Sequence, residues 1–210
     1  MPSLSQILGE RSPVLLIDAA SAVVQVGVLA PAREPRWAAR AGEAGVAVFE
    51  CLDLLGAEIG AMRAFAFCEG PGSILGIRTA AMAIRAWRAI EPRPAYAYCA
   101  LALVARALGR PGAAVVADAR RGLWHRIRAG GALERVAAAE LSGDLVTPEG
   151  FRHWEALPPG TATVPYDVAA LLADPAVAGA ELFRETESPD AFLHAEPIYA
   201  KWVPQIHRAP

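Results

Sequence analysis

The fold of this chain is decided by the stretch Glu69-Gly70-Pro71-Gly72-Ser73-Ile74-Leu75-Gly76-Ile77-Arg78. It follows an apolar run at residues 64–68, short enough for a buried strand, and precedes a long helical pattern. Gly70, Pro71 and Gly72 force a tight turn, because glycine tolerates positive φ and proline fixes its own φ. Ser73 stands at the N-cap position, where its hydroxyl would accept a backbone N–H of the helix. Such a turn either presents amides to an anion or brings a helix close to another backbone.

The phosphate-loop interpretation of this turn lacks its basic and hydroxyl side chains. A Walker loop needs Lys followed by Ser or Thr, and Ile77-Arg78 stands there instead. Glu69 would also repel an anion. The sequence therefore favours a structural turn.

Composition limits the classes of protein that this chain can represent. It has 210 residues, 54% of them hydrophobic and 20% charged, with a formal net charge of −2. This length allows one large domain or two small lobes. The apolar excess indicates a surface that a partner covers, and there is no basic excess for gripping nucleic acid alone.

The cysteines and the hydropathy of the chain predict its cellular compartment. The three cysteines, Cys51, Cys68 and Cys99, are scattered in apolar runs, which is typical of reduced thiols in a cytoplasmic protein. The first dozen residues lack the basic start and apolar core of a signal peptide. Residues 13–32 resemble a membrane span in hydropathy, but polar and β-branched residues there indicate two strands. We expect no membrane association.

The chain carries an apparent internal duplication. Residues 14–29 and 113–128 each read as strand, aspartate, turn and strand, with Asp18 and Asp118 at matching places. Helical patterns at 42–62, 73–90 and 100–108 and a strand at 95–98 lie between the copies. This alternation predicts an α/β fold with mixed sheets. The expected division is an N-terminal extension (1–12), a first lobe (13–111) and a small, irregular, proline-broken second lobe with a tail (112–210).

Four motifs in order resemble the bacterial TsaB (YeaZ) family and span most of the chain. They are Ile17-Asp18-Ala19-Ala20-Ser21, Gly70-Pro71-Gly72-Ser73-Ile74-Leu75-Gly76-Ile77-Arg78, Asp118-Ala119-Arg120-Arg121-Gly122 and His194-Ala195-Glu196-Pro197-Ile198-Tyr199. Departures from the family pattern are Leu75 and Ala19 in place of Thr, and Lys201 where Arg is common. Each motif alone is weak, whereas the ordered set is specific.

The resemblance implies a duplicated actin/hexokinase-like fold and a role as a subunit without catalysis. Proteins of this family are dimerisation partners of TsaD, which transfers a threonylcarbamoyl group to the adenosine beside a tRNA anticodon. TsaE, a small ATPase, joins them. The resemblance therefore implies a TsaD-like partner, a TsaE-like ATPase and indirect contact with tRNA. It implies no cofactor for this chain, with ATP and Mg²⁺ entering through the partners.

Two aspartates leave a nucleotide-binding alternative open. In nucleotide-binding relatives of this fold, carboxylates at the turns of Asp18 and Asp118 face phosphate and Mg²⁺, and Ser21 shares the first turn. The structural interpretation is that each Asp accepts N–H groups of its own hairpin. We favour the structural role, because the residues next to these aspartates are alanines, which offer no hydroxyl group to a ligand. An actin/hexokinase-like enzyme remains the competing hypothesis.

Metal and hydrolase chemistry receive little support from the sequence. TsaD holds its metal through histidines on its first long helix, and the matching segment 42–62 has none. The four histidines of this chain are scattered: His125, His153, His194 and His207. Related proteins were once labelled glycoproteases, but Gly72-Ser73 lacks the spacing of a nucleophile elbow.

Two predicted helices indicate a surface for a partner. Arg78, Arg85 and Arg88 form one stripe in an otherwise apolar helix, so apolar surface flanks the stripe on both sides. The preceding helix has a complementary stripe of Glu43, Glu50 and Asp53, which would pair with the arginines within the chain or across a dimer. We expect the contact with a TsaD-like partner, or with a second copy in isolation, to involve Val46, Phe49, Glu50, Asp53, Gly76, Arg78, Ala80, Ala83 and Arg85.

Overall fold

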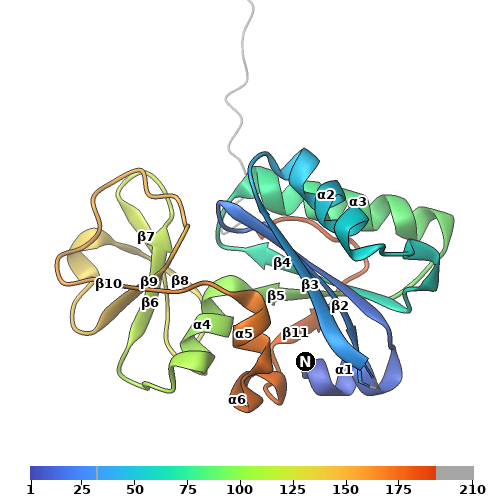
Figure 1. The fold of residues 1–210 in the computed structure, drawn as a ribbon. Coiled ribbons are helices and arrows are strands. Elements are labelled where there is room, and N and C mark those ends of the chain that lie inside the picture. Colours follow the sequence, from blue (N-terminus) through green and yellow to red (C-terminus); the bar gives the residue numbers. More distant parts are fainter. Residues whose placement is uncertain (32, 193–210) are drawn as a thin grey trace, which may run out of the picture.

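Two mixed β-sheets lie side by side and are linked through helix α4 (Ala100–Leu108; Figure 1). This computed structural model describes residues 1–31 and 33–192. The first sheet has the order β11 (Phe183–Glu185), β5 (Ala95–Cys99), β4 (Ala64–Gly70), β1 (Val14–Asp18), β2 (Val23–Ala30) and β3 (Arg33–Ala41). The second has the order β10 (Ala162–Val164), β9 (Leu145–Pro148), β6 (Ala114–Asp118), β7 (Leu123–Ile127) and β8 (Glu134–Ala137).

The second sheet repeats the topology of the first. In each, a first strand pairs antiparallel with its hairpin partner, which pairs antiparallel with a third strand: β1-β2-β3 and β6-β7-β8. The other side of the first strand then pairs parallel with β4 or β9, which in turn pairs parallel with β5 or β10. Asp18 and Asp118 end equivalent strands. The duplication predicted from the sequence is therefore present in the strand order and directions.

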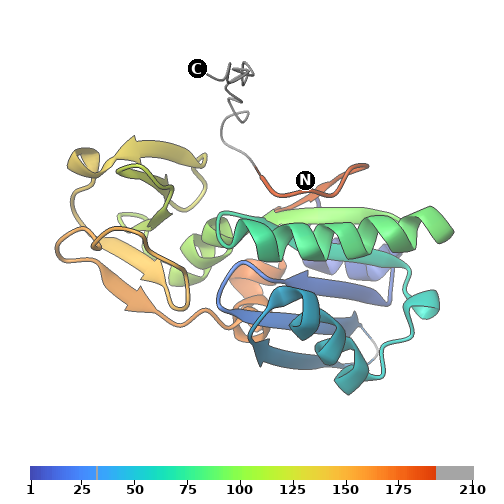
Figure 2. The ribbon, with the colours of Figure 1, turned by 90° about the horizontal axis from the view of Figure 1, so that it is seen from above.

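Helices cover both faces of the first sheet (Figure 2). Alternate strand residues such as Leu15 and Ile17 face a core shared with α2 (Ala44–Leu55) and α3 (Ile74–Ile90). Val14 and Leu16 face the opposite core, which includes α1 (Leu4–Glu10) and α4 (Ala100–Leu108). Buried parallel strands with helices on both faces explain the near-continuous apolar runs in the sequence.

The second sheet is smaller and has a separate core of five buried residues. Its largest side chain is that of Trp124, which shares this core with Val116 and Leu145. The 3-10 helix at Ala138–Glu140 follows β8, and residues 149–161 contain no helix or strand. The small and irregular character expected for this lobe is thus seen in its described part.

Both ends of the described chain belong to the first lobe, which differs from the predicted division. The capped helix α1 buries Leu4 and Ile7 in the main core, so the first dozen residues are part of the lobe. After β10 the chain returns through α5 (Val168–Ala173) and α6 (Pro175–Ala178), and β11 pairs with β5. Antiparallel pairing of distant segments has no local sequence signal, so the linear division missed it.

The segment after β2 also differs from the prediction. Strand β3 has mostly exposed side chains, including several arginines. Because polar and apolar residues alternate only weakly along it, the sequence pattern did not predict this strand. The helix expected at 42–62 ends at Leu55, because Gly56 adopts a left-handed C-cap with φ of 52°. Residues Ile59–Ala61 form a 3-10 turn instead. Among the described helices, none combines the length and the apolar character needed to cross a membrane.

Candidate functional site

An apolar surface covers the outer sides of α2 and α3, which lie next to each other (Figure 1). Ten large hydrophobic residues are exposed among those described, and seven of them lie on these two helices. We call these seven the apolar helix surface: Val46, Phe49, Leu54, Ile74, Leu75, Met82 and Ile90. Leu75 is 73% exposed and Met82 58%. Such a concentration is typical of a surface that another protein covers.

Most residues predicted for the interface are accessible there, and two are not. Val46, Phe49, Glu50, Asp53, Arg78 and Arg85 are exposed, and Ala83 is half-buried. Gly76 and Ala80 are buried inside the chain, which corrects the prediction that they face a partner. The sequence alone does not show which way a stripe of small residues faces. Here Gly76 faces the turn after β1, and Ala80 faces the core of the first lobe.

The two charged stripes do not pair with each other in the described structure. Arg78 lies 3.6 Å from the Asp190 carboxylate, whereas Arg88 donates to the carbonyls of Arg93, Thr186 and Glu187. Within residues 1–31 and 33–192, Arg85 makes no ion pair, and neither do the acidic side chains of α2. Intrachain pairing of the stripes is therefore wrong for this part of the chain.

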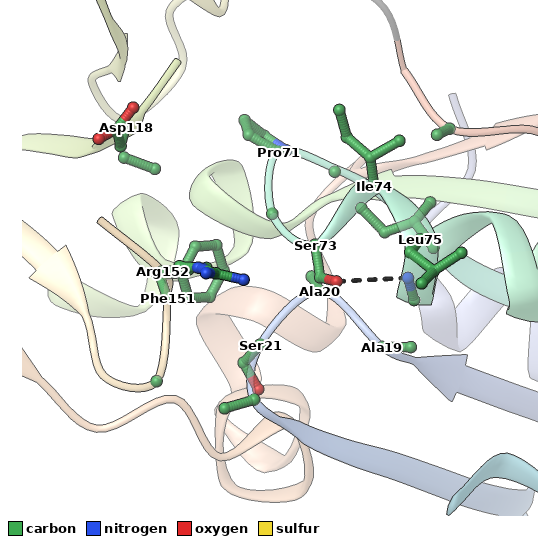
Figure 3. A pocket seen from close by; sticks show the side chains of 18 of the residues that line it. Ala19, Ala20, Ser21, Pro71, Ser73, Ile74, Leu75, Asp118, Phe151 and Arg152 are labelled. Carbon is green, nitrogen blue, oxygen red and sulfur yellow. Dashed lines mark hydrogen bonds between the residues drawn. The ribbon is translucent and has the colours of Figure 1, made fainter. Parts of the chain in front are cut away.

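The glycine turn brings the start of α3 against the turn after β1 (Figure 3). The Ser73 N–H donates to the Ala20 carbonyl at 2.7 Å, and the Ser73 hydroxyl accepts from the Gly76 N–H at 3.3 Å. A Cβ at Gly72 would collide with the Ala20 carbonyl, and one at Gly76 with the Ala19 carbonyl. The glycines thus serve the close approach of two backbones.

Asp18 is fully buried and does not face the cleft between the sheets. Its Oδ2 accepts hydrogen bonds from the Tyr98 hydroxyl at 2.6 Å and the Tyr166 hydroxyl at 2.7 Å, and its Oδ1 accepts from the Ala20 N–H at 3.0 Å. Burial raises the pKa of the Asp18 carboxyl, and these three bonds oppose the increase. The Ala20 bond agrees with the structural role favoured from the sequence, and the enclosed carboxylate disfavours the nucleotide-facing alternative for Asp18.

The tyrosines around Asp18 tie distant parts of the chain together. Tyr166 lies between β10 and α5, where the chain returns from the second lobe. The Gln25 side chain donates to the Tyr166 carbonyl and accepts from the Val168 N–H, both at 2.9 Å. Sequence reasoning missed Tyr98 and Tyr166, because neither lies in a recognisable motif.

Asp118 reaches the cleft but its carboxylate is occupied by backbone. Oδ1 accepts from the Arg120 N–H at 2.6 Å, and Oδ2 accepts from the N–H groups of Trp154 at 2.7 Å and Glu155 at 3.2 Å. Ser21 also lines the cleft, and its hydroxyl bonds to the backbone of Val23. Ser21 and one Asp118 oxygen thus bond within their own turns, in agreement with the structural role favoured from the sequence. The other Asp118 oxygen joins its turn to the loop after β9.

A cleft of about 550 Å³ lies between the two sheets. One wall is formed by the Ala19–Ala22 turn, the glycine turn and the first turn of α3. The other is formed by the turn after β6 and the loop after β9, which contribute Arg120, Arg152 and Trp154. Figure 3 shows Arg152 extending from the second lobe toward the Pro71–Ser73 turn.

Known structures share this architecture. A protein from Pseudomonas aeruginosa described as uncharacterised, with similarity to peptidase YeaZ, superposes with a TM-score of 0.60 and 22% identity. That match covers 90% of this chain and 99% of the other. YeaZ from Pseudomonas aeruginosa superposes with a TM-score of 0.54 and 22% identity, over 65% of this chain and 75% of the other. The chain has the YeaZ fold.

The likeness is one of structure, since no family model and no curated protein matches the sequence. Three of the four motifs contribute residues to the inter-sheet cleft. The fourth motif, residues 194–199, lies outside the described residues, as do Lys201, His194 and His207. Within the described part, no group of three or more His, Cys, Asp or Glu side chains has a metal-binding arrangement.

Proposed function

We propose that this chain is a TsaB (YeaZ)-family subunit, a scaffold that pairs with a TsaD-like threonylcarbamoyltransferase in tRNA modification. The observation that carries the proposal is the apolar helix surface on a YeaZ fold. Seven large hydrophobic side chains on two adjacent helices cost free energy while they contact water. A partner that covers them removes this cost.

The charges around the apolar helix surface suit a specific interface. Glu50 and Asp53 lie on α2 and Arg85 on α3, all exposed and without intrachain ion pairs in the described structure. Charges at the border of an apolar contact select the partner and its orientation more than they add affinity. In the absence of a TsaD-like partner, a second copy of the chain would occupy the same surface.

The proposal assigns no bond chemistry to this chain. Asp18 is enclosed by two tyrosines and Asp118 is held by three backbone N–H groups, which disfavours both as Mg²⁺-directed carboxylates. The repeated sheet topology supports a duplicated actin/hexokinase-like architecture that serves here as a platform. We place the protein in the cytoplasm, with a TsaE-like ATPase as a further partner and tRNA contacted indirectly.

Co-purification tests the interface directly. Tagged chain would be mixed with the TsaD-like enzyme of the same organism, and the recovered enzyme measured for the native chain, Met82→Glu and Arg85→Glu. We expect both variants to lose most of the recovered enzyme, because Met82→Glu buries a charge in the contact and Arg85→Glu reverses one at its border.

The matched control for Arg85→Glu is Arg128→Glu, an exposed arginine of the second lobe outside the apolar helix surface. It should recover enzyme like the native chain, and all variants should keep the native circular dichroism spectrum. Native recovery by both Met82→Glu and Arg85→Glu would remove this surface from the account.

A further inference from the structure

The last described segment of the chain runs along helix α3. The Arg88 guanidinium, near the end of α3, donates to the carbonyls of Thr186 and Glu187 at 3.3 and 2.7 Å. Arg78, near the start of α3, lies 3.6 Å from the Asp190 carboxylate. The segment therefore runs antiparallel to α3, and two arginines of the helix hold it.

This segment ends beside the apolar helix surface. The Phe192 N–H donates to the Glu69 carbonyl at 2.7 Å, directly before the glycine turn that leads into α3. Phe192 lines one cavity together with Ile74 and Leu75, the first two members of the apolar helix surface on α3. The chain thus enters its last stretch, residues 193–210, from the border of that surface.

The composition of residues 193–210, which we call the terminal segment, suits an apolar face bordered by acids. Lys201 and Arg208 outnumber the single acid Glu196. Six of its residues are large and hydrophobic: Leu193, Ile198, Tyr199, Trp202, Val203 and Ile206.

Helix α2 offers the complementary charge. Glu50 and Asp53 are exposed on it, and Glu43 precedes its first turn. The sequence of α2 contains no basic residue, and these three acids have no ion-pair partner in the part of the chain that the structure describes. A net positive, apolar segment therefore matches both the hydrophobic side chains and the charge of this surface.

The terminal segment is also long enough to cross both helices. A fully extended chain spans about 3.3 Å per residue, so this segment reaches about 60 Å. Helix α3, with 17 residues, is about 25 Å long. Its attachment at Phe192 gives the segment a high effective concentration at the surface, which no free peptide has.

We propose that the terminal segment covers the apolar helix surface of its own chain and has to leave it before a TsaD-like enzyme binds. Coverage removes exposed hydrophobic side chains from water in the isolated chain. A second copy of the chain would have to displace the segment in the same way. The competition with the enzyme rests on the proposed function, whereas the coverage does not.

Photo-crosslinking of the full chain tests the coverage without a partner. An aromatic crosslinker, p-benzoylphenylalanine, replaces Trp202, and mass spectrometry identifies its targets in a mixture of isotope-labelled and unlabelled chain. We expect crosslinks to peptides of α2 and α3 within one chain. Met82→Glu, which places a charge on the surface, should lower their yield severalfold, whereas Arg128→Glu on the second lobe should leave it unchanged.

The affinity for the TsaD-like enzyme, measured by calorimetry, tests the competition. Trp202→Glu should tighten binding by about tenfold, the factor expected if coverage occupies about nine-tenths of the isolated chains. Gln205→Glu is the matched control, because it adds the same charge to the same segment at a polar position. It should bind like the native chain.

Three results would overturn the inference. They are the absence of crosslinks to α2 and α3, crosslinks only between a labelled and an unlabelled chain, and an affinity of Trp202→Glu equal to or weaker than the native one. The second would assign the segment to another copy, and a weaker affinity would make it part of the enzyme contact. If intrachain crosslinks form but neither the native chain nor Trp202→Glu binds the enzyme, the proposed function fails and the coverage stands.

Discussion

Asp18 shows how one buried carboxyl can organise a fold instead of a reaction. It ends the first strand, and two tyrosines from different parts of the chain donate to the same oxygen. A buried carboxylate without such donors would be costly, because water no longer solvates it. The two hydroxyls thus offset part of the burial cost while they connect β1, β5 and the returning segment before α5.

Tyr166→Phe should therefore destabilise the protein by about 1–3 kcal/mol, because it removes one charge-assisted hydrogen bond from a buried acceptor. The loss should grow with pH. The folded-state pKa of Asp18 is already raised by burial, and loss of a donor to the charged form raises it further. A raised carboxyl pKa means that the folded state binds the proton more tightly than the unfolded state does. The contribution of Asp18 to the free energy of unfolding therefore falls as pH rises through that pKa.

Urea unfolding followed by circular dichroism at about pH 5 and about pH 8 measures this dependence. Tyr96→Phe is the control, because the Tyr96 hydroxyl does not donate to Asp18. Equal losses for Tyr166→Phe at both pH values, or a larger loss at the lower one, would contradict the assigned role of Asp18.

At the scale of elements, the glycine turn determines how closely α3 approaches β1. Gly76 lies in the first turn of α3, and the Ala19 carbonyl occupies the space where a Cβ would be. Gly76→Ala should destabilise the protein by about 1–3 kcal/mol through this overpacking. Thermal unfolding measures the change.

Gly45→Ala in α2 is the matched control, because nothing but the Glu43 side chain lies near its Cβ position. It should be neutral or stabilising by up to about 1 kcal/mol, since alanine favours helix. A Gly76→Ala variant as stable as Gly45→Ala would show that close approach is not what requires glycine there.

Sequence reasoning predicted the elements whose signals are local. Strands β1, β2, β4 and β6 and helices α3 and α4 follow from apolar runs, turn glycines and prolines. It missed β3 and β11, because an exposed edge strand and a three-residue strand are defined by their pairing partners. For the same reason it found Asp18 but not its tyrosines, and it placed Gly76 and Ala80 on the wrong side of a correctly predicted helix.

At the scale of the whole molecule, the duplicated sheets separate two surfaces. The apolar helix surface lies on the first lobe, whereas Arg120 and Arg152 line the cleft from the second. Tyr166 and Gln25 fix the segment that joins the lobes, so a partner that covers α2 and α3 would meet a preorganised platform.

The central claim is that the apolar helix surface of α2 and α3 binds a TsaD-like subunit. Light scattering of the purified mixture tests this claim most directly. The account predicts a single species with the summed mass of one enzyme and one copy of this chain, lost on Met82→Glu. Separate peaks for the two native proteins at micromolar concentration would contradict it, the more so if the isolated chain turned over a substrate without its partner.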